Sequence, residues 1–357
     1  QIMSTQTCLL ALILLPAILA FSISKDDPLL LVQTIIRHGD RAPTTTWATN
    51  RSAEILFRGL GELTDEGIDH ANAQGFAFKK RYVDSGFIDR RYLPTQVYFR
   101  SSPYNRCLMS AAAFGAGLFD RTPGLRNRVP PIITNENDTL LESDNTSAAF
   151  WELFAGYYNI TVPQGVDPTT AILAVYAGLL EMVDWNCPNV SISLIDSIIS
   201  EAANHLIHLP KAYKECADGP AKKSMFQFDC LLTGTCPGNL IPDLTSYFTG
   251  NLVSTLFTNM QNAVINATAS TIFNVYYAHD INVLAIAQVF GVVDAFHGTA
   301  PAFSSALVLE LRNGTAGPYV RVLLKDGFDA PFNVVLDKND PSSNLDTIIQ
   351  TKQIYVS

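Results

Sequence analysis

The sequence predicts an α/β protein: a three-layer sandwich with a mostly parallel central sheet and a largely helical cap insertion. Apolar runs typical of buried strands alternate with amphipathic helical patterns at both ends of the chain, and this alternation builds parallel sheets through right-handed crossovers. Between these two parts lies a segment of helical patterns broken by Pro and Asn. We therefore predict an α/β core of residues 26–120 and 271–340 that carries the active site, and a mostly helical cap of residues 121–270.

The first residues, 1–22, are predicted to be a secretory signal peptide. The run from Cys8 to Phe21 is apolar but shorter than the about 20 residues that a membrane-spanning helix needs. Ala20-Phe21-Ser22 supplies a small-x-small cleavage site. No Lys or Arg precedes the run, which leaves a signal anchor as the alternative. Because no second long apolar run follows near the C-terminus, we predict no membrane span in the mature chain.

The sequons and cysteines agree with export. Seven Asn-x-Ser/Thr sequons occur, at Asn50, Asn137, Asn145, Asn159, Asn189, Asn266 and Asn313. After the leader, five cysteines remain: Cys107, Cys187, Cys216, Cys230 and Cys236. Five is odd, so at least one thiol is free or pairs outside the chain, and Cys107 in a predicted apolar helix is the candidate. We predict a secreted glycoprotein with disulfide bonds, and the lysosomal lumen is the alternative location.

The first predicted strand, residues 29–36, runs directly into a loop of unusual composition. Its residues are apolar or β-branched apart from Gln33, which is typical of a strand buried on both faces. The loop that follows is Arg37-His38-Gly39-Asp40-Arg41-Ala42-Pro43. Ligands bind at the carboxyl ends of strands in α/β sheets, and guanidiniums match phosphate oxygens with paired donors. The pattern predicts an anion site.

Two more strand and helix pairs repeat this arrangement. A helix begins after Thr64, its expected N-cap, and is followed by a strand at residues 94–99 that ends at Arg100. An apolar helix at residues 104–119 comes next. Beyond the cap, a strand at residues 271–278 ends at His279-Asp280 and leads into an apolar helix at residues 281–290. Strands at 304–311 and 319–324, separated by Asn313-Gly314, are predicted to form an antiparallel hairpin at one sheet edge.

Within the cap, helical patterns occur around residues 169–183, 191–207 and 244–264. Acidic residues outnumber basic ones there, and no Lys or Arg lies between Val129 and Pro210. The whole chain of 357 residues has a net charge of −9, which argues against nucleic acid as a partner. Any anion site must therefore be local.

Three strand ends would surround one crevice if the strands are neighbours in a parallel sheet. Their chemistry suits transfer of a phosphoryl group, which needs neutralised phosphate oxygens, a nucleophile in line with the leaving oxygen, and an acid to protonate that oxygen. Arginines meet the first need, a histidine nitrogen the second and Asp280 the third.

These residues resemble the signatures of the histidine acid phosphatases. Residues 37–43 are similar to the RHGxRxP signature, and Tyr277-Ala278-His279-Asp280 to the second, HD, signature. Leu63-Thr64-x-x-Gly67 and the stretch from Phe99 to Ser110 match the segments between. The resemblance implies the phosphoglycerate-mutase-like fold of the animal secreted, lysosomal and prostatic-type acid phosphatases.

The resemblance also implies roles for single residues. His38 would be the nucleophile that forms a phosphohistidine, and Asp280 the proton donor. The phosphate-binding residues would be Arg37, Arg41, Arg100 and His279. No metal and no cofactor is implied, the substrate would be a small-molecule phosphomonoester, and a homodimer is expected by family analogy only.

Several residues receive a structural interpretation instead. Arg106, on the helix after Arg100, is expected to be a salt-bridge partner, and Glu310 a solvated residue. His70, His205, His208 and His297 are expected to be surface or packed histidines, and Asp40 is given no catalytic role.

Three alternatives to the acid phosphatase remain. A phytase would need extra basic residues in a cap that is acidic. A mutase of the same fold would normally be intracellular. The third is a catalytically silent secreted binding protein.

Overall fold

The computed structural model describes residues 26–119, 130–142, 147–185, 187, 190–205, 209–217, 219–265 and 271–356. The predicted signal peptide, three of the sequon asparagines (Asn145, Asn189 and Asn266) and His208 lie outside these residues. The other four sequon asparagines are exposed. No described helix is long and apolar enough to cross a membrane.

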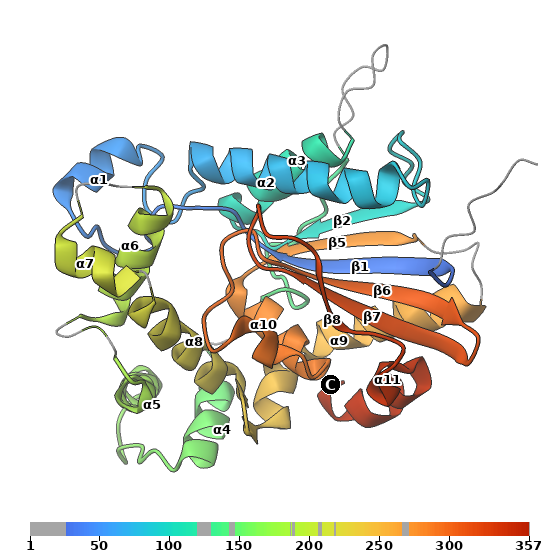
Figure 1. Cartoon of the computed structure of the whole chain (residues 1–357). Helices are drawn as coiled ribbons and strands as arrows, with labels where there is room; N and C mark the ends of the chain where they lie inside the picture. Colours follow the sequence, from blue (N-terminus) through green and yellow to red (C-terminus); the bar gives the residue numbers. More distant parts are fainter. Residues whose placement is uncertain are drawn as a thin grey trace, which may run out of the picture.

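A six-stranded sheet forms the centre of the protein, in the order β2-β5-β1-β6-β7-β8 (Figure 1). The strands are β1 (Leu29–Arg37), β2 (Val97–Ser101), β5 (Phe273–Ala278), β6 (Ala306–Gly314), β7 (Gly317–Lys325) and β8 (Asn333–Leu336). β5 pairs in parallel with β1 and with β2, whereas the pairs β1–β6, β6–β7 and β7–β8 are antiparallel. Strands β2, β5, β1 and β7 thus point one way, which confirms the predicted mostly parallel sheet. The hairpin is confirmed too, but β8 covers its outer edge and was not predicted.

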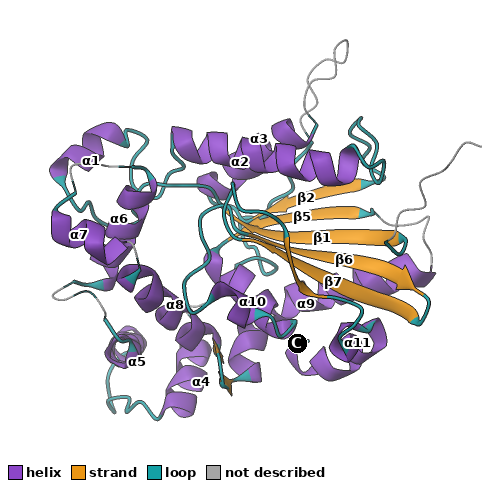
Figure 2. Ribbon diagram, in the orientation of Figure 1, coloured by secondary structure: helices purple, strands orange, loops and turns teal. Residues whose placement is uncertain are grey.

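Helices cover both faces of the sheet and complete the three layers (Figure 2). One face carries α2 (Asp65–Phe78), which continues as a π-helical turn (Lys79–Val83), and α3 (Asn105–Leu118). The other face carries α9 (Pro242–Ile265), α10 (Asp280–Val289) and α11 (Leu345–Lys352). Side chains of β1 alternate between the two interfaces, because Leu31 and Ile35 pack with the second group of helices and Val32 and Ile36 with the first.

The remaining helices gather beyond the carboxyl ends of β1 and β5 (Figure 1). They are α1 (Asn50–Ile55), α4 (Ala148–Tyr158), α5 (Pro168–Met182), α6 (Ile192–Ala203), α7 (Lys211–Ala217) and α8 (Pro220–Thr233). We call α4 to α8 the cap helices. Phe150 and Leu179 anchor an apolar cluster of their own, separate from the clusters of the sheet. A short hairpin, β3 (Thr235–Cys236) and β4 (Asn239–Leu240), joins α8 to α9.

Disulfide bonds brace the cap. Cys187 pairs with Cys216, and Cys230 pairs with Cys236. Cys107 is free and buried in α3, as predicted. Helix α9, which falls within the predicted cap range, packs its second half against the sheet through Leu256 and Met260. The helical layer on this face of the sheet therefore includes residues that the sequence assigned to the cap.

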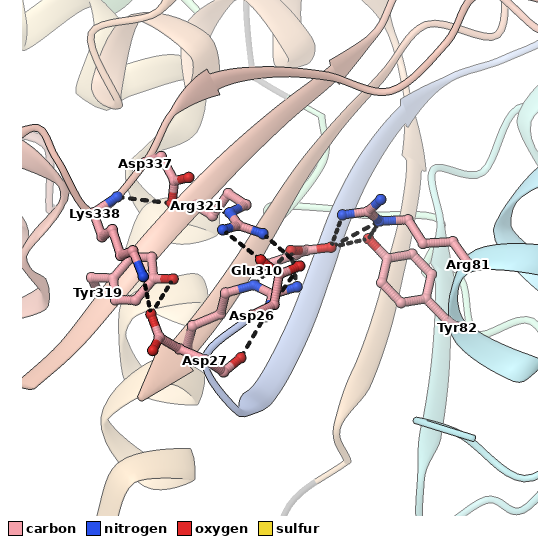
Figure 3. A network of polar contacts seen from close by, with 10 residues as sticks. Asp26, Asp27, Arg81, Tyr82, Glu310, Tyr319, Arg321, Asp337 and Lys338 are labelled. Atoms are coloured by element: carbon pink, nitrogen blue, oxygen red, sulfur yellow. Dashed lines mark hydrogen bonds and ion pairs between the residues drawn. The ribbon is translucent and has the colours of Figure 1, made fainter. Parts of the chain in front are cut away.

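Charged residues form a network near the start of β1, at the end of the sheet away from the carboxyl ends of β1 and β5 (Figure 3). The prediction that Glu310 is a solvated residue is wrong, because its side chain is fully buried. One carboxylate oxygen accepts hydrogen bonds from Arg81 and from the Tyr82 hydroxyl, and the other from Arg312. Arg321 bridges Asp337 and Asp26 nearby. A buried carboxylate is tolerated here because guanidiniums and a hydroxyl satisfy both oxygens.

Candidate active site

The carboxyl ends of β1 and β5 open into a cleft of about 570 Å³ between the sheet and the cap helices. Core residues on its wall include Arg37, Arg41 and Asp280, and the cap contributes Asp196 from α6 and Asp229 from α8. The cleft lies where an α/β sheet is expected to bind its ligand. Two of the predicted strand ends therefore meet around one cavity.

His38 follows β1 and is almost fully buried, with 2% of its surface exposed. Its Nδ1 lies 2.9 Å from the Gly39 carbonyl oxygen. A carbonyl can only accept, so Nδ1 carries the proton and Nε2 keeps a free electron pair. Burial holds the pKa of His38 well below its usual value, and the charges of Arg106, Arg41 and Arg37 lower it further. His38 is therefore a neutral imidazole with an available nucleophilic nitrogen, even at acid pH.

Two glycines let the loop after His38 pack against the start of α2. A Cβ on Gly39 would lie 2.5 Å from the Gly67 carbonyl oxygen, and a Cβ on Gly67 would lie 2.1 Å from the Asp40 carbonyl oxygen. The hydroxyl of Thr64 donates to the same Asp40 carbonyl and accepts from the Gly67 amide. Close backbone approach thus explains why the Leu63-Thr64-x-x-Gly67 pattern accompanies the loop.

Arg37 and Asp280 form an ion pair in the wall of the cleft. Nη2 of Arg37 lies 2.6 Å from Oδ2 of Asp280, and Nη1 of Arg37 donates to the Pro301 carbonyl oxygen. The Arg37 guanidinium also stacks 4.2 Å over the Phe303 ring. Burial alone would raise the pKa of Asp280, but Arg37 and His279 lower it below the usual value. Without substrate, Asp280 is a carboxylate.

Arg41 is held by one face of the cap helix α6. Its guanidinium binds both carboxylate oxygens of Asp196, at 2.7 and 3.3 Å, and donates to the Ser200 hydroxyl at 3.1 Å. The Asn204 amide donates to the Arg41 carbonyl oxygen at 3.1 Å. Positions 196, 200 and 204 lie four apart and therefore share a helix face. The sequence interpretation missed this support.

Arg100 is already paired with a carboxylate of the protein. Its guanidinium lies 2.7 Å from Asp138, whose carboxylate also accepts from the Leu140 and Leu141 amides. Both partners of this ion pair are buried. The segment that contains Ile133 adds to the edge of β2 beside Arg100. The geometry therefore favours a structural ion pair over the predicted phosphate contact.

Arg106, which the sequence interpretation set aside as a salt-bridge partner, occupies the position expected of a third anion-binding guanidinium. It lies in the first turn of α3, it forms no ion pair with any described residue, and among charged groups it affects the pKa of His38 most. The Nε atoms of Arg37, Arg41 and Arg106 are all buried and find no hydrogen-bond acceptor among the described residues. Three unsatisfied guanidinium donors around one imidazole call for an anion.

His279 stands beside His38, with ring centroids 5.6 Å apart. Its Nε2 lies 2.9 Å from Glu142 and 3.2 Å from the Ser102 hydroxyl. Burial lowers the pKa of His279, but the Cys107 sulfur and the Glu142 carboxylate outweigh burial and raise the pKa to about 9. His279 is therefore a cation that can contact an anion bound at His38.

One further pair in the lining of the cleft was not predicted. His70, expected to be a surface or packed histidine, lines the cleft with Asp40. Its Nδ1 lies 2.6 Å from the Asp40 carboxylate, and its ring stacks on Phe328 at a centroid distance of 3.5 Å.

Among the described residues no cluster of three or more His, Cys, Asp or Glu side chains could hold a metal ion.

Comparison with curated proteins finds animal acid phosphatases. "Putative acid phosphatase 1" of Caenorhabditis elegans is 40% identical over 118 residues, which are 33% of this chain and 26% of that protein. Testicular acid phosphatase of Mus musculus is 41% identical over 121 residues, 32% of this chain and 27% of that protein. Lysosomal acid phosphatase of Homo sapiens is 35% identical over 116 residues, with coverage of 32% and 27%. The matched stretches thus span less than a third of these relatives' length.

Comparison with solved structures extends over nearly the whole chain. The phytase of Hafnia alvei has a TM-score of 0.61 at 17% identity, covering 92% of this chain and 97% of that chain. The phytase of Citrobacter braakii has a TM-score of 0.61 at 14% identity, covering 92% and 98%. These likenesses show the fold. Residues 29–153, which contain His38, match the profile of the histidine phosphatase superfamily (branch 2).

Proposed function

We propose that this protein is a secreted acid phosphatase that hydrolyses phosphate monoesters through a phosphohistidine intermediate. The observation that carries the proposal is the set of three buried Nε donors, from Arg37, Arg41 and Arg106, around the neutral imidazole of His38. The names of the curated relatives support an acid phosphatase activity. Arg106 takes the place first given to Arg100, whose charge Asp138 already balances.

In the first half of the proposed reaction, Nε2 of His38 attacks phosphorus. A nitrogen–phosphorus bond forms, the bond from phosphorus to the ester oxygen breaks, and the leaving oxygen takes a proton from Asp280. The guanidiniums and His279 neutralise the phosphate oxygens as charge spreads over them. In the second half, water attacks the phosphohistidine and returns a proton to the carboxylate. The sum is one ester and one water giving one alcohol and one phosphate.

The lining of the cleft favours a simple monoester over a hexaphosphate. Six aspartates line it, against Arg37, Arg41 and Lys222 as its strong bases. A substrate with five further phosphates would meet these carboxylates outside the reacting position. We expect turnover of inositol hexakisphosphate to be far below that of an aryl phosphate, and the reverse order would move the proposal to a phytase.

Export is part of the proposal. Two disulfide bonds are typical of an oxidising compartment, and four described sequon asparagines are exposed where a glycan could be attached. The lysosomal lumen meets the same conditions. Family analogy adds a homodimer, which sedimentation of the purified protein would test.

The decisive experiment is rapid-quench labelling with a radiolabelled aryl phosphate at acid pH. Wild type should carry an acid-labile, base-stable phosphoryl label, and His38→Ala should carry none. Arg100→Met is a useful companion, because it should still be labelled once its folding is verified. Phosphate release without label would show direct attack by water, and neither label nor release would favour the silent binding protein.

A further inference from the structure

Asp229 is a buried carboxyl group that the proposed reaction does not yet use. It lies on the cap helix α8, one wall of the cleft, and only 4% of its surface is exposed. Its Oδ2 is buried and finds no hydrogen-bond donor among the described residues. A carboxylate left without a donor in such a place costs far more free energy than a protonated carboxyl does.

The charges around Asp229 reinforce that state. Asp280 at the start of α10 and Asp196 on α6 line the same cleft and oppose a further negative charge on Asp229, whereas Arg37 at the end of β1 favours one. Lys222 on α8 and Tyr176 on α5 line the same cleft. Burial first, and Asp280 second, raise the pKa of Asp229 well above its usual value. Arg37 meanwhile keeps Asp280 ionised.

We propose that Asp229 holds the proton of a carboxyl pair with Asp280 and supplies it to Asp280 when substrate binds, so that Asp280 can protonate the leaving oxygen. The inference rests on the proposed phosphatase reaction and adds a source for its proton. A phosphate dianion that binds Arg37 competes with Asp280 for the guanidinium. Asp280 then becomes the stronger base of the two carboxyl groups and accepts the proton from Asp229.

The protons balance over the cycle. When the bond from phosphorus to the ester oxygen breaks, the proton held by the pair passes to that oxygen and leaves both carboxyl groups ionised. The water that attacks the phosphohistidine then gives one proton back to the pair. Asp229 does not touch the substrate in this scheme and acts as a positioning residue through Asp280.

The test compares two substrates, because a poor leaving group needs the proton and a good one does not. In Asp229→Asn, we expect kcat/KM for phenyl phosphate near neutral pH to fall by about 10- to 100-fold, and kcat/KM for p-nitrophenyl phosphate to change by less than about threefold. The alkaline limb of the phenyl phosphate pH profile should move to lower pH, because Asp280 alone loses its proton earlier. Asp229→Glu should recover part of the lost activity.

The matched control is Asp243→Asn, which removes an acidic group outside the cleft that is bonded to Tyr157. It should leave both substrates and the pH profile unchanged. If Asp229→Asn does not fold, Asp229→Ser offers a smaller polar side chain for the same comparison. Equal loss with both substrates and an unmoved pH profile would overturn the inference and leave the phosphatase standing. A wild-type protein without any phosphatase activity would overturn the proposed function itself, and the inference with it.

Discussion

The choice between Arg106 and Arg100 as the third phosphate-binding arginine gives the sharpest prediction. Arg106→Ala removes one of the three guanidiniums beside His38 whose Nε finds no acceptor among the described residues. Loss of a donor that acts on the transition state costs about 3–4 kcal/mol, so kcat/KM for p-nitrophenyl phosphate should fall about 100- to 1,000-fold. Arg106→Lys keeps the charge but loses the forked donors and should recover only part of the activity.

The same substitution should change the pH profile. Arg106 contributes the largest charge effect that lowers the pKa of His38, after burial itself. Without this charge, the pKa of His38 rises toward its usual value, and a larger fraction of the imidazole is protonated at acid pH. The acid limb of the kcat/KM profile should therefore move to higher pH in Arg106→Ala.

Arg100 provides the contrast. Arg100→Met leaves the Asp138 carboxylate buried without its cation, which costs about 3–5 kcal/mol of the free energy of unfolding. Chemical denaturation followed by circular dichroism would measure this loss, and Asp138→Asn in the same protein should reduce it. Activity per folded molecule should stay near wild type. Full activity in Arg106→Ala together with inactive, folded Arg100→Met would refute this reading of the site.

Three further predictions concern packing, the buried network and pH. Gly67→Ala places a Cβ against the Asp40 backbone and should lower both activity and the melting temperature, measured with the purified variant, whereas unchanged values would show that the loop can move away. Glu310→Gln weakens a network far from the cleft and should lower the free energy of unfolding by about 3–5 kcal/mol with kcat/KM unchanged, and an activity loss in folded protein would contradict that separation. The folded-state pKa of His279 is about 9, above its usual 6.5, so its contribution to stability is complete below pH 6.5 and is lost as pH rises toward 9. Unfolding of His279→Asn over this interval should show a flatter pH dependence, and an equal slope would disprove the assignment.

The strands and most helices could be predicted because their signals are local. The apolar run of residues 29–36 became β1, and the Thr64 cap and the pattern after it became α2. β8 escaped prediction because it is only four residues long, and a short apolar run of this kind does not by itself distinguish a strand from a loop. The burial of Glu310 was equally hidden, since its partner Arg81 lies more than two hundred positions away on α2's continuation.

The site residues that directly follow a predicted strand could be predicted from the sequence, whereas those on other elements mostly could not. The helix face of Asp196, Ser200 and Asn204 carries no unusual residue type. Nothing in the local sequence shows that this face contacts Arg41. Arg106 did carry a usable signal. A basic residue in the first turn of a helix opposes the helix dipole, so its presence at the start of α3 indicates that an anion is expected there.

The acid preference of the proposed reaction follows from the way the cleft distributes its charges. Arg37 and Arg41 each bind a carboxylate in the described structure, from Asp280 and Asp196 respectively. A phosphate dianion must compete with these built-in anions, and its advantage grows when a carboxyl group takes a proton. Because burial and nearby arginines lower the pKa of His38 well below its usual value, the nucleophile stays unprotonated at a pH where a free histidine would be charged. The same arginines lower the pKa of Asp280, so Asp280 can hold the proton for the leaving oxygen only once the bound phosphate competes for the Arg37 guanidinium.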